Sequence, residues 1–289
     1  MTDHPIWGWD AQGWPHAEHS RFREAAGIRW HLQRLGRGPK VLLLHGTGAA
    51  THTWRGVLPL LAPCFEVLAL DLPGHGFTSM PLPSRMGIGG MAADIATLLE
   101  AEGFRPDILV GHSAGAVIAV RLALDGLAPR RILSINGALL PLSGPAGQLF
   151  APIARFLAGL PFVASFLAWR AADRATVERL LRDTGSVLDA EGVELYARLF
   201  RRAGHVQATL TMMARWDLHG FRAELPRLGA PLTLIAATGD RTIAPATARE
   251  VQRLLPHAEV VEWPGLGHLA HEERPDLLAA LLAPICEPA

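Results

Sequence analysis

Cysteine is nearly absent from this chain of 289 residues, which contains only Cys64 and Cys286. The two are not arranged as a CxxC pair, so their spacing gives no indication of a thiolate metal site. Two cysteines are also too few for the disulfide framework of a small secreted domain, and such scarcity is typical of a reducing cytosol. We therefore predict no disulfide framework and a cytoplasmic location.

An excess of charge of either sign is missing as well, because 27 Lys and Arg residues balance 27 Asp and Glu residues. A balanced surface without a local basic patch has no general attraction for nucleic acid, and we predict none as a partner. The first 22 residues lack a basic start followed by an apolar core, so we expect no secretory signal. Apolar residues, by contrast, make up 49% of the chain, as in a globular protein with a large core.

The chain also lacks the usual signatures of metal and nucleotide sites. It contains 13 histidines but no H-E-x-x-H motif, and HLAHEE at 268–273 does not place two ligands with a third at helical spacing. No glycine-rich phosphate loop follows the first buried strand, and MGIGGM at 86–91 has no strand before it. We expect neither a metal ion nor a cofactor.

Segments typical of strands and of helices alternate, which favours an α/β fold with a mostly parallel central sheet and helices on both faces. A hairpin is predicted at 21–36, turning at Ala26 and Gly27. The other predicted strands are 40–46, 65–76, 107–111, 131–136, 231–240 and 258–263, and the predicted helices include 89–103, 247–255 and a closing helix at 273–285.

This alternation stops at 138–217, where helical patterns follow one another without strands between them. We predict that 138–217 is a helical cap, or lid, inserted into a core formed by 1–137 and 218–289.

The cap contains an apolar segment, 149–169, that is long enough to span a bilayer. Arg155 lies within it, however, and Pro152 and Pro161 interrupt the helical pattern. We therefore expect cap helices over an apolar pocket. Peripheral contact with the inner membrane stays open as an alternative, since such a surface suits the headgroup region.

The stretch LVGHSAGAVIAV at 109–120 places Ser113 between a strand pattern and a helix pattern. A G-x-S-x-G motif at such a bend exposes the serine hydroxyl above the sheet, at the positive end of the next helix. The alternative is that the small residues only allow close packing of helix on strand. In this context we predict that Ser113 is a nucleophile.

A serine hydroxyl needs a base, and the base needs a carboxylate that orients it. His268 follows the last predicted strand in a glycine-flanked loop, and His271 is its competitor. Asp240 directly follows an apolar strand, with a helix or turn cap as its alternative role, and Asp217 is the reserve acid. We predict the catalytic set Ser113, Asp240 and His268.

The developing oxyanion requires two backbone N–H donors. We expect one from Ala114, which follows the nucleophile, and the other from Thr47 in the loop after the first buried strand. Trp54 is a candidate for the pocket border, with plain core as the alternative.

The motifs HGTG, DLPGHGFTS, GHSAG, GD and GHLAHEERP occur in the order seen in the α/β-hydrolase superfamily, which this chain resembles over nearly its full length. Dehalogenases and epoxide hydrolases of that superfamily use an aspartate where Ser113 stands. Further segments, including INGALLPLSGPAG, TGSVLDAEGVELYARL and MMARWDL, are similar to the magnesium-chelatase accessory proteins of bacteriochlorophyll biosynthesis.

This second resemblance implies a role near magnesium insertion into protoporphyrin IX. It implies a lipophilic ligand, protoporphyrin IX or its magnesium complex, and as partner the magnesium chelatase or the next enzyme of the pathway. We expect the cap to bind this ligand through a set of apolar side chains: Phe156, Phe162, Met212, Met213 and Trp216.

Three functions compete at this point. The first is hydrolysis of an ester or similar acyl bond of a lipophilic molecule by a Ser-His-Asp triad. The second is a non-catalytic porphyrin carrier or assembly factor for the chelatase, and the third is a general carboxylesterase. The fold alone does not separate them, but a binding protein has no need of all three triad residues, so we favour the first.

Overall fold

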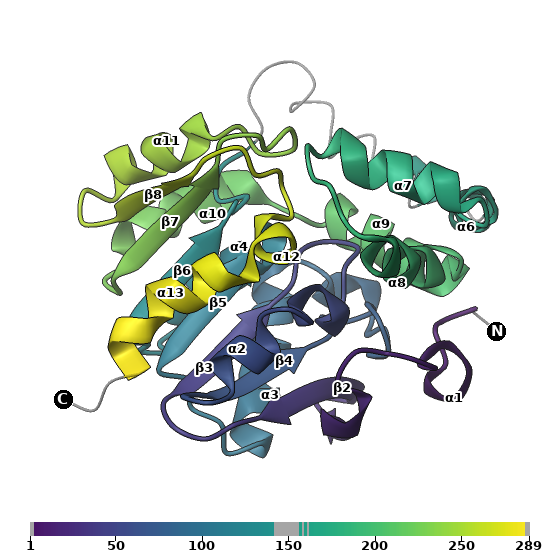
Figure 1. The fold of residues 1–289 in the computed structure, drawn as a ribbon, viewed down its shortest axis with the longest axis horizontal. Coiled ribbons are helices and arrows are strands. Elements are labelled where there is room, and N and C mark those ends of the chain that lie inside the picture. The colour runs from purple at the N-terminus through teal and green to yellow at the C-terminus, as the bar shows by residue number, and fades with distance from the viewer. Residues whose placement is uncertain (1–2, 142–155, 158, 161, 287–289) are drawn as a thin grey trace.

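The computed structural model describes residues 3–141, 156–157, 159–160 and 162–286. In these residues one eight-stranded sheet runs through the molecule in the order β1-β2-β4-β3-β5-β6-β7-β8 (Figure 1). Its strands are β1 (Ser20–Ala25), β2 (Ile28–Leu35), β3 (Lys40–Leu44), β4 (Glu66–Leu70), β5 (Ile108–His112), β6 (Arg131–Ile135), β7 (Leu232–Ala237) and β8 (Glu259–Trp263).

The sheet is mostly parallel, which confirms the predicted fold class. Only β2 runs in the opposite direction, since it pairs antiparallel with both of its neighbours, β1 and β4. The β1–β2 hairpin turns where predicted, because Ala26 and Gly27 both have a positive φ, 54° and 69°, as a two-residue hairpin turn requires. The central strands are almost wholly buried runs of Val, Leu and Ile, as expected of strands covered on both faces.

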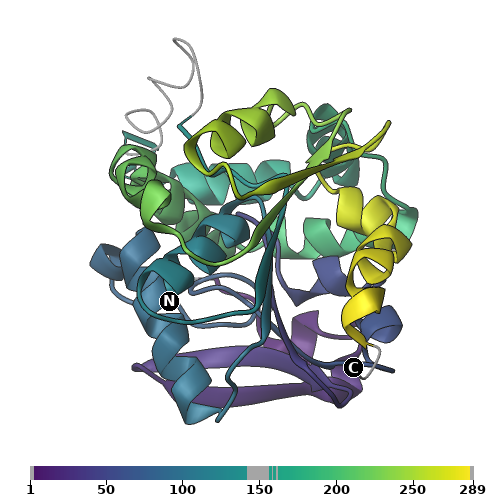
Figure 2. The ribbon, with the colours of Figure 1, turned by 90° about the vertical axis from the view of Figure 1, so that its left-hand side faces the viewer.

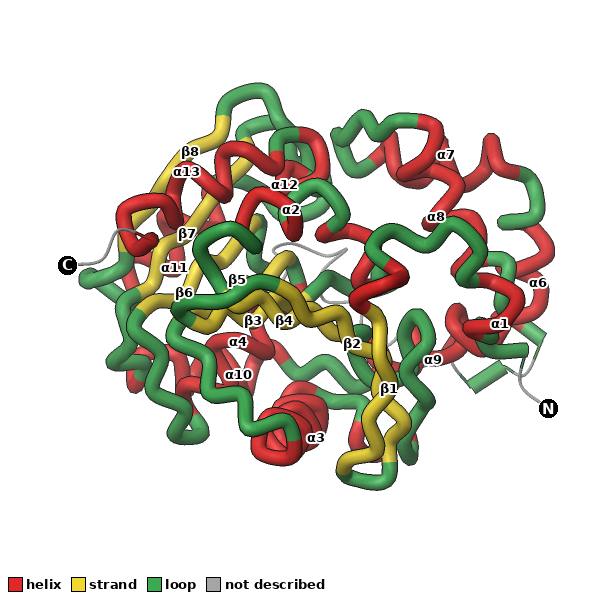
Figure 3. The backbone as a smooth tube through the Cα atoms, turned by 60° about the horizontal axis from the view of Figure 1, so that its bottom comes forward, coloured by secondary structure: helices red, strands yellow, loops and turns green. Residues whose placement is uncertain are grey.

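Helices cover both faces of the sheet (Figures 2 and 3). One apolar cluster packs a first group against one face: α3 (Ile88–Ala101), α4 (Ala114–Leu124), α10 (Leu218–Glu224) and α11 (Ala246–Leu254). A second cluster packs another group against the other face: α2 (Leu58–Leu61), α12 (Ala270–Glu273) and α13 (Pro275–Cys286). A short helix, α1 (Trp7–Asp10), precedes the sheet.

Four helices between β6 and β7 lie together beyond one end of the sheet, at the right of Figure 1. They are α6 (Val163–Arg170), α7 (Arg174–Asp183), α8 (Ala190–Phe200) and α9 (Ala203–Ala214). Asp173 and Asp189 cap α7 and α8 by accepting hydrogen bonds from Ala175 N and Gly192 N. We call α6–α9 the inserted helices. The inserted helices lie within 138–217, the stretch predicted as a cap. That this stretch is a unit separate from the core stays a prediction.

The apolar segment 149–169 is described only in part, because residues 149–155, 158 and 161 lie outside the described residues. Within the described part, no helix is both long enough and apolar enough to cross a membrane.

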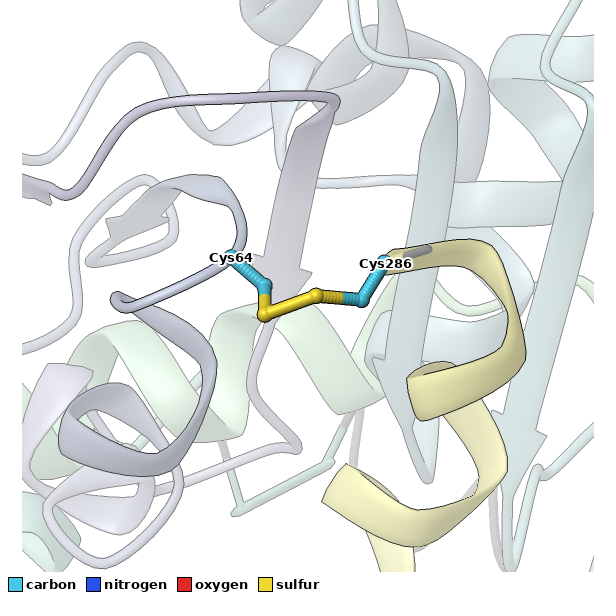
Figure 4. Close-up of a disulfide and its surroundings, with 2 residues drawn as sticks. All are labelled: Cys64 and Cys286. Atoms are coloured by element: carbon cyan, nitrogen blue, oxygen red, sulfur yellow. A yellow bond between two sulfur atoms is a disulfide. The ribbon is translucent and has the colours of Figure 1, made fainter. Parts of the chain in front are cut away.

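The two cysteines form a disulfide, Cys64–Cys286, which corrects the prediction from cysteine content (Figure 4). Cys64 lies between α2 and β4, Cys286 ends α13, and their Cα atoms are 5.5 Å apart. Because α13 packs on the same face of the sheet as α2, the fold joins residues that are 222 positions apart in sequence. Spacing along the chain could not reveal this pair.

Candidate active site

Ser113 stands at the sharp bend between β5 and α4. Its φ and ψ of 52° and −114° are unusual for a residue other than glycine, and such strain clusters at functional sites. The bend requires a glycine at 115, since a Cβ there would overlap the carbonyl oxygen of Leu44. Ser113 N donates to the carbonyl oxygen of Ile135 at 3.0 Å, which ties the bend to β6. The local sequence thus folds as the G-x-S-x-G pattern predicts.

His268 and Asp240 come together from loops that follow β8 and β7. His268 Nδ1 lies 2.8 Å from Asp240 Oδ2, and both residues are 7% exposed. The other carboxylate oxygen, Oδ1, accepts from Thr242 N at 2.7 Å and from Ile243 N at 2.9 Å. A carboxylate fixed in this way can orient the imidazole ring.

Two residues to which the sequence analysis assigned no role hold the His268 loop. Asn136, just after β6, donates from Nδ2 to the carbonyl oxygens of Gly267 and His268 at 3.1 and 2.9 Å. Its Oδ1 accepts from Ala237 N at 2.8 Å, so it also fixes the end of β7. His112 Nε2 lies 2.9 Å from the carbonyl oxygen of His268. In the sequence, only their position at the ends of predicted strands pointed to Asn136 and His112.

The two reserve residues of the sequence analysis have other contacts. His271 is fully buried in α12, with Nε2 2.7 Å from Thr53 Oγ1. Its ring packs at a tilt against the rings of His112 and Trp54, with centroids 4.5 and 4.6 Å away. Asp217 is the N-cap of α10 and accepts from His219 N and Gly220 N. It is therefore Asp240, not Asp217, that lies against His268.

The loop after β3 approaches the bend at Ser113 closely. A Cβ on Gly46 would lie only 2.7 Å from His112 Nδ1 and 3.1 Å from Ser113 Cβ. This approach brings Thr47 next to the nucleophile candidate, and Thr47 Oγ1 lies 3.9 Å from Met212 Sδ of α9. Ala114 opens α4, and the first amides of a helix have no partner within it.

A cavity of about 800 Å³ lies between this region and the inserted helices. Its wall includes Ser113, His268, Thr47 and Ala114, together with apolar side chains of the inserted helices. The volume is within the usual range of small-molecule sites, about 300–1,000 Å³. The predicted nucleophile, base and oxyanion donors thus face one largely apolar space.

Of the six predicted substrate-binding residues, Met212, Met213 and Trp216 line the cavity. The other three are not among the described lining residues, which corrects those expectations. Trp54 is fully buried in the core beneath α2 and α13. Phe156 and Phe162 are 68% and 65% exposed.

A buried polar cluster joins the inserted helices to the core beside the His268 loop. Glu272 of α12 accepts hydrogen bonds from Tyr196 of α8 at 2.8 Å and from Thr53 at 2.7 Å, and it pairs with Arg55. Arg55 also reaches the α8 cap, Asp189, at 3.3 Å. Burial raises the pKa of the Glu272 carboxyl, and Arg55 opposes that shift. These contacts join α8 to α12.

Buried histidines lie on and beside the cavity wall: His112 lines it, and His205 Nε2 lies 3.1 Å from the carbonyl oxygen of the lining Gly48. Burial lowers the pKa of His112 well below its usual value, and the neighbouring His271 and His268 add to this effect. Burial likewise lowers the pKa of His205 to about 3. Within the described residues, no group of three or more His, Cys, Asp or Glu could hold a metal ion.

Comparison with known proteins supplies the family. The model of the "Alpha/beta hydrolase family" matches residues 41–281. The "Magnesium-chelatase 30 kDa subunit" of Rhodobacter capsulatus is 39% identical over 93% of this chain and 95% of its own length. A "Dihydrolipoyllysine-residue acetyltransferase component of acetoin cleaving system" of Cupriavidus necator is 31% identical over 91% of this chain and 67% of its own.

Solved structures share the fold at lower identity. An esterase from Exiguobacterium antarcticum superposes with a TM-score of 0.75 at 14% identity, covering 92% of this chain and 99% of that one. At this identity the likeness concerns the fold alone.

Proposed function

Because this chain belongs to the alpha/beta hydrolase family, we propose that it is a serine hydrolase with the triad Ser113, His268 and Asp240. The observation that carries the proposal is the convergence on one cavity. Ser113 in a strained bend and His268, paired with Asp240 at 2.8 Å, both line it, although they come from distant parts of the chain.

The proposed reaction is acyl transfer to Ser113 followed by hydrolysis. Ser113 Oγ attacks the carbonyl carbon of an ester while His268 Nε2 takes the hydroxyl proton. Asp240 keeps the proton of His268 on Nδ1 and stabilises the imidazolium. The amides of Thr47 and Ala114 stabilise the oxyanion. The protonated His268 then donates its proton to the leaving alcohol. In the second half, water attacks the acyl carbon while His268 Nε2 takes its proton, and His268 returns that proton to Ser113 Oγ as the carboxylic acid leaves.

The proposed substrate is a lipophilic molecule of bacteriochlorophyll biosynthesis, near the insertion of magnesium into protoporphyrin IX. The relative from Rhodobacter capsulatus is named as a subunit of magnesium chelatase, which supports this pathway and the chelatase as partner. The apolar cavity wall, with Met212, Met213 and Trp216, suits a large flat ligand, because flexible thioethers adapt to an irregular surface.

A labelling experiment tests both parts of the proposal. A fluorophosphonate should label the wild-type protein covalently, and Ser113→Ala should abolish the label while changing the free energy of unfolding by less than about 1 kcal/mol. Protoporphyrin IX or its magnesium complex should block labelling of the wild type. Undiminished labelling of Ser113→Ala would contradict Ser113 as the nucleophile.

The second candidate function is a porphyrin carrier or assembly factor for the chelatase. It is favoured by the relative's name as a chelatase subunit and by the large cavity. Complementation separates the two functions. A host that lacks the corresponding gene should regain pigment with the wild type and not with Ser113→Ala, whereas a carrier would function without the hydroxyl. Labelling without any pigment effect would indicate a general carboxylesterase.

Peripheral membrane contact is also part of the proposal. The outer face of α6 exposes Phe162, Phe166 and Trp169 at 65%, 54% and 66%, and exposed aromatic side chains suit the headgroup region. Flotation with vesicles of anionic lipid tests this contact, and Trp169→Ser should weaken it. Binding that is equal in both proteins would contradict a role for this face.

A further inference from the structure

Two arginines on the cavity wall lack the partners that neighbouring arginines have. Arg170 ends α6 and Arg179 lies in α7, and both line the cavity while exposed to solvent. Neither makes an ion pair with any residue in the described part of the chain. By contrast, Arg174, Arg182 and Arg198 of the inserted helices each pair with a glutamate. Two guanidinium groups are therefore free to bind a ligand.

These arginines stand where the cavity opens to solvent. Leu167 of α6 and Leu180 of α7 line the cavity and are nevertheless 39% and 53% exposed, so this wall forms its mouth. Ser113 and His268 line a different part of the cavity, beyond the ends of strands β5 and β8. A ligand that fills the space would therefore have an apolar body inside and one end between α6 and α7.

We propose that the cavity takes an amphiphilic carboxylate, with an apolar body and an acid group, and that Arg170 and Arg179 bind the acid group at the mouth. The proposal rests on the proposed function, since it places the substrate in this cavity. A guanidinium binds a carboxylate through two parallel hydrogen bonds, and the surrounding leucines reduce competition from water. Asp183 also lines the cavity, four residues after Arg179, and it repels an anion there.

Paired acid and ester ligands test this assignment. The probes are cis-parinaric acid and protoporphyrin IX, each compared with its methyl ester, and the measured quantity is the ratio of the ester Kd to the acid Kd. All Kd values are measured in the Ser113→Ala background, in which the proposed hydrolysis of the methyl esters is blocked. This protein should prefer each acid by about tenfold or more. Arg170→Gln with Arg179→Gln should bring both ratios close to one, and Asp183→Asn should raise them. Arg222→Gln, an exposed arginine of α10 away from the cavity wall, is the control and should leave them unchanged.

The outcomes separate this inference from the proposed function. Unchanged ratios in the double variant, with a melting temperature like that of the wild type, would overturn the role of the two arginines. If the arginine substitutions lower the ratio for parinaric acid but no form of the protein binds protoporphyrin, the arginines' role is supported and the tetrapyrrole substrate is ruled out. An ester preference in the Ser113→Ala protein would overturn the carboxylate assignment outright.

Discussion

Mild acid should unfold this protein, because buried histidines are kept in the neutral form. Burial lowers the pKa of His205 to about 3, and it lowers those of four others well below the usual 6.5: His52, His75, His112 and His271. In the unfolded chain each would take up a proton near pH 6.5. Between that pH and the folded pKa the unfolded state binds more protons, so stability falls as the pH falls.

The expected effect is large compared with the stability of a typical domain. Each such histidine lowers the free energy of unfolding by about 1.4 kcal/mol per pH unit below its unfolded pKa. The five together lower it by up to about 7 kcal/mol per unit, whereas proteins are stable by only about 5–15 kcal/mol. Stability present above about pH 7 should therefore be lost between about pH 6.5 and about pH 5.

Urea unfolding followed by tryptophan fluorescence, at several pH values across this window, measures the slope. His52→Leu gives the sharpest comparison, because neither ring nitrogen of His52 has a hydrogen-bond partner among the described residues. The variant should reduce proton uptake on unfolding by about one and the slope by about 1.4 kcal/mol per pH unit. His257→Gln, at an exposed histidine, should leave the slope as it is. A free energy that stays constant from about pH 7.5 to about pH 5.5 would refute the reasoning.

Three further predictions concern the site and the disulfide. His268→Ala should lower ester hydrolysis roughly a thousandfold or more, whereas His271→Ala should chiefly lower the melting temperature; the reverse pattern in a matched assay would show that the wrong base was chosen. Asn136→Ala should destabilise the fold by about 1–3 kcal/mol and reduce kcat, since the His268 loop loses two hydrogen bonds; an unchanged kcat would argue against this positioning. Reduction, or Cys286→Ser, should lower the free energy of unfolding by about 2–4 kcal/mol, and wild type that melts identically with and without reductant would contradict it.

The sequence by itself determined the parts of this protein that depend on neighbouring residues. Short apolar runs predict the central strands, and the Ala26-Gly27 turn predicts the hairpin. The small residues around Ser113 specify its bend, because only glycine at 115 lets α4 approach β3. These features are local, so a short window of sequence contains the physical information that fixes them.

Only the tertiary structure decided which distant residues meet. It joined Cys64 to Cys286 against the expectation from composition, because helices on one face of the sheet bring them together. It placed Asp240 rather than Asp217 against His268, and it revealed Asn136 as the anchor of that loop. It likewise left Phe156 and Phe162 exposed and outside the described cavity wall, and it placed Arg170 and Arg179 on that wall. Helical periodicity limits which side chains share a face, but the packing of one element on another decides what that face contacts.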